Sequence, residues 1–261
     1  MRYGRILAGE LHKAATLPAV WGGVAGALLG ALAVTLLNSV AARAALENGR
    51  AEAWGSTSPF ENAYAAMPLT VVGAVVLGVV VISSEYTANR ADAGGGRQIA
   101  TTLTVTPYRI QVLAAKAITV VVGVMVIAPA TLLVTVGLAR LVIGGGAETV
   151  SVTAAVTRCL GGTLYATLTG LIAFAVTVLT RSGILPLLVL IMNSTLVSGS
   201  LLLTKLTPLA HWLPDLAGRR LFGGLDTVDG GLAPLPGAIV MSGWTLALLV
   251  IAGAVFSRRD A

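Results

Sequence analysis

Six stretches of the chain are long, apolar and free of charge, and they limit the possible folds more than any other feature. None contains Asp, Glu, Lys, Arg or His, and each has about the 20 residues with which a helix crosses a bilayer. They cover residues 18–41, 63–83, 117–139, 159–179, 184–204 and 237–256. Only 11% of the 261 residues are charged, against about 25% in soluble domains. We therefore predict an all-α polytopic membrane protein, a single transmembrane domain over residues 1–261 with six spanning helices.

The basic residues that flank these stretches predict an orientation. Six spans place both termini on one side of the membrane. That side would hold ten of the 17 Lys and Arg residues, and the other side would hold seven. A bias of this sign favours cytoplasmic termini under the positive-inside rule. The loops at 42–62, 140–158 and 205–236 would then lie outside the cell.

The segment before the first span predicts an amphipathic helix on the cytoplasmic membrane surface. An apolar residue recurs at helical spacing, at Tyr3, Leu7, Leu11 and Ala14. We assign to the other faces of this helix the polar residues Arg2, Arg5, Glu10, His12 and Lys13. A helix with one apolar edge that joins directly to a span forms an elbow at the interface.

Residues 84–116 form the largest feature predicted on the cytoplasmic side. Within them, the sequence TANRADAGGG at 87–96 is rich in turn-forming residues and predicts a flexible loop. Ile99 and Leu103 stand four residues apart and give one apolar edge to a short helix at about 97–105. Thr106 before Pro107 is typical of an N-cap followed by the first helical residue. The third long helix is therefore expected to begin at Pro107.

The residue inventory argues against a catalytic, metal or nucleic-acid site. The single cysteine, Cys159, excludes an intramolecular disulfide and a multi-cysteine metal site. The two histidines, His12 and His211, fall on opposite sides of the membrane, so no metal cluster or Ser/His/Asp triad can be assembled. The Gly-rich GGGR at 94–97 lacks the GxxxxGK[ST] pattern of a nucleotide-hydrolysing loop. Basic residues flank the spans instead of forming one face, which argues against nucleic acid.

The fifth stretch is the most polar of the six. Its polar residues are Asn193, Ser194, Thr195, Ser198, Ser200 and Thr204. Offsets of seven and eleven residues place Asn193, Ser200 and Thr204 on one helical face. Such a face either lines a path or bonds to a neighbouring helix, and the residues alone leave both readings open. In the first stretch, glycines at intervals of four from Gly22 to Gly30 predict close packing within the chain.

Residues 205–236 are too short for a domain and too patterned for a plain loop. Prolines and aromatic residues, among them Trp212, Pro214 and Phe222, alternate there with charged residues. Tryptophan is enriched at membrane–water boundaries. We predict short extracellular helices between the fifth and sixth spans, lying on or in the outer leaflet.

Several motifs, in their order along the chain, resemble the permease subunits of ABC-2 type exporters. Around the second and third spans these are the Glu-Tyr pair at 85–86, TTLTVTPYR at 101–109 and VLAAK at 112–116. GELHKAATLPAVW at 9–21, WLPDLAGRRLFGG at 212–224 and the tail SRRDA at 257–261 are also similar to that family. One departure is the TANRADAGGG segment, which stands where family members commonly have Gly-Thr-Ile/Leu-Arg. We interpret it as an enlarged loop.

The resemblance implies the permease half of an ATP-driven drug or peptide exporter in a bacterial cell membrane. Two permease subunits, identical or related, would form the translocation path within the lipid bilayer. Two copies of a separate ABC ATPase subunit would bind ATP and Mg. This chain would then bind no cofactor itself and would not be an enzyme.

The resemblance and the residue patterns together assign candidate site residues. For coupling to the ATPase they are Glu85, Arg97, Ile99 and Leu103. For the translocation path they are Asn193, Thr195, Ser200 and Thr204. For the extracellular cap they are Trp212, Pro214 and Phe222. The alternative is a secondary transporter driven by an ion gradient, but such proteins usually carry ionisable residues at membrane depth, and the six stretches have none.

Overall fold

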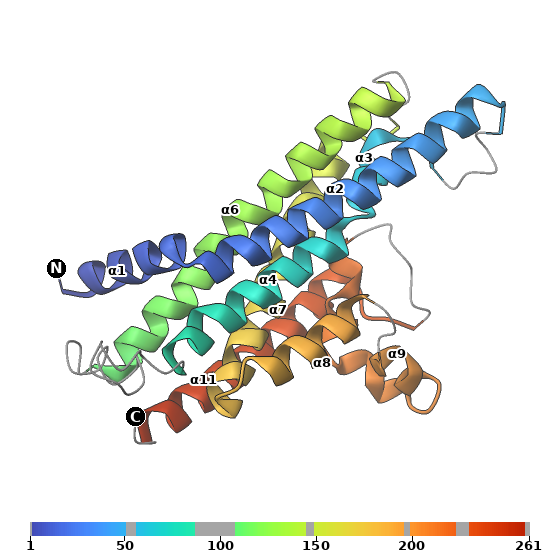
Figure 1. Cartoon of the computed structure of the whole chain (residues 1–261). Coiled ribbons are helices and arrows are strands. Elements are labelled where there is room, and N and C mark those ends of the chain that lie inside the picture. The colour runs from blue at the N-terminus through green and yellow to red at the C-terminus, as the bar shows by residue number, and fades with distance from the viewer. Residues whose placement is uncertain are drawn as a thin grey trace.

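The computed structural model describes residues 2–50, 56–86, 108–144, 149–195, 199–222 and 230–258. This part of the chain is almost entirely helical and contains no strand (Figure 1). Five of its helices are long and apolar enough to cross a membrane, over Pro18–Glu47, Pro59–Tyr86, Arg109–Ile143, Val152–Thr180 and Pro234–Arg258. The all-helical architecture is therefore confirmed for the described residues, and helix length and apolarity are those of a polytopic membrane protein.

Helices α1 (Arg2–Thr16) and α2 (Pro18–Glu47) meet at an elbow. Leu17 between them has an extended backbone, and Pro18 takes the first helical position of α2, where a missing N–H leaves no bond unmade. The indole Nε1 of Trp21 donates to the carbonyl oxygen of Ala15 at 2.6 Å, which satisfies one of the last carbonyls of α1. The elbow is thus held by a specific bond, while its place at the membrane surface remains a prediction.

The second apolar stretch folds as three consecutive elements, α3 (Pro59–Tyr64), α4 (Met67–Ser83) and the 3-10 turn η2 (Ser84–Tyr86). Ser58 caps α3, because its Oγ accepts a hydrogen bond from the N–H of Glu61 at 3.4 Å. Most of α4 is buried against α7 (Val152–Thr180), and these two helices form the centre of the bundle. Around them, α2, α6 (Arg109–Ile143) and α11 (Pro234–Arg258) expose many apolar side chains.

Helices α4 and α7 approach each other until their backbones touch. A Cβ atom placed on Gly78 would lie 2.1 Å from the carbonyl oxygen of Gly170, so no larger residue fits there. The glycine ladder of α2 behaves differently, because Gly22 and Gly26 have open space where a Cβ would lie. The prediction of close packing within the chain is therefore wrong for those two glycines, while Gly30 makes an ordinary contact with a leucine of α4.

The fifth predicted span, at 184–204, is described as two separate helices. These are α8 (Ile184–Thr195) and α9 (Gly199–Thr204), and residues 196–198 lie outside the described part. α8 packs against the α4 and α7 residues Val75, Val79 and Ala173. Its 12 residues reach about 18 Å, which is short of the ~30 Å hydrocarbon core. The count of six spans therefore stays a prediction.

Three short helical segments follow α9. They are η5 (Pro208–Trp212), α10 (Pro214–Ala217) and η6 (Arg219–Phe222). Two glycines of the long helices let this segment sit directly on their backbones. A Cβ on Gly237 of α11 would lie 1.9 Å from the carbonyl oxygen of Ala217, and one on Gly161 of α7 would lie 2.2 Å from that of Leu221. The segment is fixed to the bundle, and its extracellular location remains a prediction.

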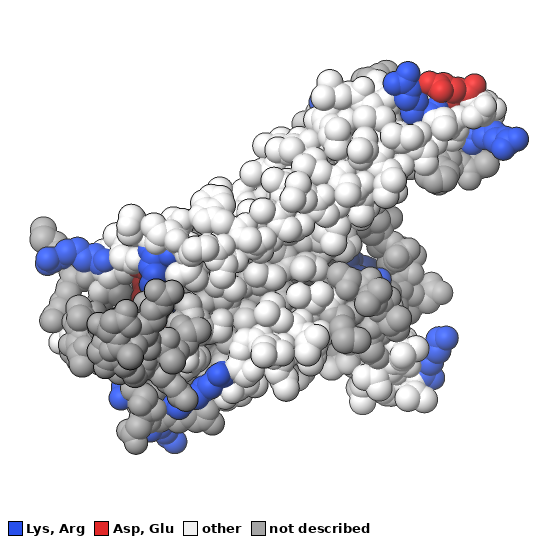
Figure 2. Space-filling model, viewed as in Figure 1, with Lys and Arg blue, Asp and Glu red and all other residues white. Residues whose placement is uncertain are grey.

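Charged residues lie toward the two ends of the bundle. Figure 1 shows α1 and the last turn of α11 at the same end, which we name the near end; α2 and α6 finish at the opposite, far end. Figure 2 shows a broad band of uncharged residues between charged groups at the two ends of the visible face. On α6, 24 residues separate Lys116 from Arg140, or about 36 Å at 1.5 Å per residue. That length matches a hydrocarbon core of about 30 Å with its boundaries.

The segment at 87–107 lies outside the described residues. The predicted helix at 97–105 and the predicted helix start at Thr106 and Pro107 both fall in it. As described, α6 begins at Arg109, after an N-cap at Tyr108 that makes no side-chain capping bond.

We predict that Gly78→Ala destabilises the bundle by about 1–3 kcal/mol, because the added methyl group overlaps the Gly170 carbonyl and pushes α4 from α7. The matched control is Gly26→Ala, where open space accepts the methyl group. The midpoint of thermal unfolding in detergent should fall for the first variant and stay unchanged or rise for the second. Equal midpoints would show that α4 and α7 are not in backbone contact.

Candidate functional site

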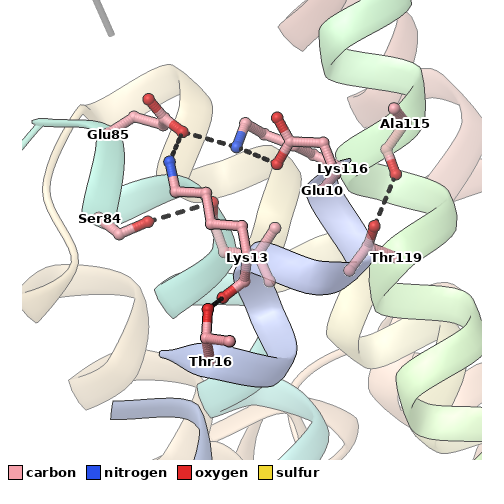
Figure 3. A network of polar contacts seen from close by, with 9 residues as sticks. Glu10, Lys13, Thr16, Ser84, Glu85, Ala115, Lys116 and Thr119 are labelled. Atoms are coloured by element: carbon pink, nitrogen blue, oxygen red, sulfur yellow. Dashed lines mark hydrogen bonds and ion pairs between the residues drawn. The ribbon is translucent and has the colours of Figure 1, made fainter. Parts of the chain in front are cut away.

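Four charged residues form a buried cluster at the near end (Figure 3). The Nζ of Lys116 lies 2.6 Å from Glu10 Oε2 and 2.7 Å from Glu85 Oε1. Lys13 donates to the same oxygen of Glu85. The side chains of Lys116 and Glu85 are 2% and 1% exposed, and that of Lys13 is 24% exposed. We name these four residues the near-end cluster; its two acids and two amines make it neutral overall.

The near-end cluster joins three elements that are distant in sequence. Glu10 and Lys13 come from α1, Glu85 from η2 and Lys116 from α6. Glu85 stands two residues before the segment at 87–107, and Lys116 stands nine residues after it. The ion pair between Glu85 and Lys116 therefore joins η2, which precedes that segment, to α6, which follows it.

The position of Glu10 corrects a prediction. Glu10 had been assigned to a face of α1 away from the apolar edge, and that assignment is wrong because Glu10 is buried. Glu10 follows Leu7 by three residues and precedes Ala14 by four, so the helical repeat places it on the same edge. A carboxylate on the apolar edge of a helix needs a cation on the facing element. This signal was available in the sequence and would have pointed to a partner such as Lys116.

The cluster depends on all its members because its charges are out of water. An unpaired ammonium or carboxylate in such surroundings costs several kcal/mol, and removing one partner of a buried pair typically costs about 3–5 kcal/mol. Lys116 has two carboxylates, and the second positive charge that balances them is Lys13. Docking of α1 against α6 is therefore required once Lys116 is buried.

η2 has a second set of neighbours, in the turn between α7 and α8. The guanidinium of Arg181 lies 6.0 Å from the ring centroid of Tyr86. A Cβ placed on Gly183 would lie 3.1 Å from the Cβ of Ser83. Arg181 ends α7 with φ of 54°, the left-handed conformation that terminates a helix. η2 is thus in contact with α1 and α6 through Glu85 and with the α7–α8 turn through Tyr86.

A second ion pair, which is partly buried, stands at the far end between α3 and α7. Arg158 makes two hydrogen bonds to Glu61, of 2.5 and 2.9 Å. Its guanidinium also lies over the rings of Tyr64 and Phe60, at 4.5 and 5.1 Å from their centroids. The hydroxyl of Tyr64 donates to the Arg158 carbonyl oxygen at 2.8 Å. Cation–π contact and a two-bond carboxylate pair both suit a planar guanidinium.

One of the predicted cap residues, Phe222, packs against an aromatic residue of this far-end site. Phe222 is buried, with its ring against those of Tyr64 and Tyr165 at centroid distances of 6.4 and 4.7 Å. Trp212 is exposed, and its carbonyl oxygen accepts a hydrogen bond from Nε1 of Trp244 at 2.9 Å. Pro214 begins α10. The three residues therefore belong to one folded segment, and a capping role for it stays a prediction.

The predicted path residues are divided between two helices. Asn193 and Thr195 lie in the last turn of α8, and their side chains lie outside the described part. Ser200 of α9 donates to Asp215 Oδ1 at 2.9 Å. Thr204 donates to the carbonyl oxygen of Leu201 at 2.7 Å. Residues 196–198 between Asn193 and Ser200 lie outside the described part, so the shared helical face stays a prediction, and Ser200 bonds to the segment that follows.

Of the predicted coupling residues, Glu85 is a member of the near-end cluster, whereas Arg97, Ile99 and Leu103 lie outside the described residues. Because Glu85 is buried, its effect on a partner would pass through the elements that it holds. Among the described residues, no group of three or more His, Cys, Asp or Glu side chains could hold a metal ion.

We predict that Lys116→Met lowers stability by about 3–5 kcal/mol, because it leaves two buried carboxylates with one cation. The double variant Lys116→Met/Glu10→Met should recover most of this loss, since the remaining Lys13–Glu85 pair is neutral. The exposed pair of Arg43 and Glu47 supplies the control, where Arg43→Met should cost less than about 1 kcal/mol. Thermal unfolding in detergent measures all three. A double variant no more stable than Lys116→Met would mean that packing, and not charge balance, explains the loss.

Comparisons with known proteins add no identification. No protein-family model, curated protein or solved structure matches the chain. A function for this chain therefore has to be inferred from its own residues and contacts, together with the resemblance of its motifs.

Proposed function

We propose that this chain is the transmembrane permease subunit of an ATP-driven exporter of the ABC-2 type. The observation that carries the proposal is the near-end cluster. It binds the elements on both sides of the 87–107 segment to each other and to α1. A membrane protein driven by an external motor needs such a rigid joint, because a force applied at one loop must reach several helices together.

The proposed mechanism begins with an ABC ATPase subunit that docks on the 97–105 region, with Ile99 and Leu103 as apolar anchors and Arg97 as a charged contact. Binding and hydrolysis of ATP with Mg in the ATPase displace this region. η2 and α6 then move as one body with α1, because Lys116 and Lys13 hold Glu85 between them. α8 packs on α4 and is carried with it. In this way a displacement at the near end reaches the helices proposed to line the path.

The proposed assembly contains two permease subunits, identical or related, and two ATPase subunits. α2, α6 and α11 expose apolar side chains along much of their length, and in the assembly these face lipid or the second permease. Asn193, Thr195, Ser200 and Thr204 are proposed to line the path, with Trp212, Pro214 and Phe222 in its cap. The proposed location is the bacterial cell membrane, with six spans and both termini in the cytoplasm.

A secondary transporter driven by an ion gradient is the second candidate. The observation in its favour is that Glu10 and Glu85 are ionisable groups buried in the bundle, and such groups often carry protons in gradient-driven transporters. Both acids are held by lysines in a neutral cluster, which favours a structural role. The two candidates differ in one requirement, because only the exporter needs an ATPase partner.

We predict that an affinity-tagged chain, purified gently from its own membranes, retains an ATPase whose hydrolysis is inhibited by vanadate. Lys13→Gln should leave the amount of bound ATPase unchanged and reduce hydrolysis several-fold, because it weakens the joint while leaving Lys116 its two acids. His12→Gln is the matched control, an exposed neighbour on the same helix. If no ATPase is retained, the exporter proposal is refuted. Equal hydrolysis by the two variants would show that the near-end cluster takes no part in coupling.

The proposed topology predicts a labelling pattern for single cysteines in a Cys159→Ala background. Asn48 at the far end and His12 at the near end are both exposed, so a cysteine at either position is accessible to a reagent in water. In intact cells, a membrane-impermeant thiol reagent should label Asn48→Cys and spare His12→Cys. After the membrane is permeabilised, both should react. Labelling of His12→Cys in intact cells would show that the topology is the reverse of the proposed one.

A further inference from the structure

The described acids of the near end are buried, whereas two of its arginines are exposed. Within the described part of the near end, the acids are Glu10 and Glu85, and both belong to the buried cluster. Arg5 of α1 and Arg258 at the end of α11 are exposed. The cluster therefore does more than join helices. Because it buries both described acids, the described charge that faces outward at this end is positive.

The far end has a different surface. There Glu47 is 63% exposed beside Arg43, which is 58% exposed, so an acid and a base lie together at the surface. The far end therefore exposes an acid among its bases, which include Arg50 and Arg140, whereas the described acids of the near end are both buried.

Two exposed aromatic residues at the near end are typical of the headgroup zone of a membrane. Trp21, at the elbow between α1 and α2, is 59% exposed, and Tyr108, at the start of α6, is 48% exposed. Tryptophan and tyrosine at the ends of apolar helices are typical of the zone of lipid headgroups. Tyr108 directly precedes Arg109, and Trp21 lies in the first turn of α2, just after the elbow. These two residues thus place the elbow and the start of α6 in the headgroup zone.

We propose that the near end binds the headgroups of anionic phospholipids, with Arg5 and Arg258 as their principal contacts. The positive charge of each side chain attracts the negatively charged phosphate of a headgroup. With Glu10 and Glu85 neutralised inside the cluster, no described acid at this end repels a negative headgroup. Each arginine near an anionic membrane surface strengthens binding about fivefold. This inference concerns the lipid alone and does not depend on whether the chain is a permease.

The test measures the thermal unfolding of the purified full-length chain in a neutral detergent while phosphatidylglycerol is added. Phosphatidylcholine, which has no net charge, is the control lipid. A ligand that binds only the folded state raises the unfolding temperature with its concentration. Phosphatidylglycerol should raise it at lower concentrations than phosphatidylcholine, and added NaCl should reduce the difference by screening.

Three double variants separate the near end from general effects of charge. Arg5→Gln/Arg258→Gln should raise the half-maximal phosphatidylglycerol concentration by roughly 25-fold. Arg5→Lys/Arg258→Lys, which keeps the charge, should retain most of the response, and so should the far-end control Arg43→Gln/Arg140→Gln. Equal effects of the two lipids would overturn the proposal. So would a far-end variant that loses as much response as the near-end variant, or a lysine variant that loses as much as the glutamine variant.

Discussion

The burial of one ammonium group, that of Lys116, determines how the near end is assembled. Burying an ammonium group is costly unless carboxylates contact it directly, and here the carboxylates come from α1 and η2. Their arrival brings two negative charges to one positive charge, and Lys13 restores the balance. The amphipathic helix, the end of the second span and the start of the third are therefore fixed by one electrostatic requirement, which surface packing alone would not impose.

The middle of the bundle follows a different rule, in which close backbone contact takes the place of charge pairing. Gly78 with Gly170, and Gly237 with Ala217, allow backbones to touch where side chains would separate them. Without a hydrophobic force between helices inside a bilayer, close van der Waals contact is the main source of attraction. At the far boundary, Arg158 combines a carboxylate with two aromatic faces. The near end thus depends on ion pairs between buried charges, the middle of the bundle on backbone contact, and the far boundary on an ion pair with cation–π contacts.

The sequence predicted the helices better than their contacts. Charge-free apolar runs identified five of the long helices, because in lipid the backbone must satisfy its own hydrogen bonds. The run at 184–204 looked continuous, and the structure describes α8 and α9 within it, with residues 196–198 outside the described part. Glu10 could have been placed by its helical spacing, but the pairing of Glu61 with Arg158 could not, since it joins residues 97 positions apart. Exposed and buried glycines look alike in sequence, which is why Gly26 and Gly78 had to be separated by the structure.

The separation in sequence of the near-end partners has a consequence for biogenesis. Glu10 and Lys116 are 106 positions apart, and Glu85 and Lys116 are 31 apart. A nascent chain that has released its first two apolar helices into the membrane presents Glu10 and Glu85 before the residue that neutralises both has left the ribosome. Until then neither acid has the lysine that they share, so both are more stable in water than buried. We expect α1 to remain undocked until the third long helix emerges, so that the closing of the cluster marks the moment at which the amino-terminal half of the chain is assembled.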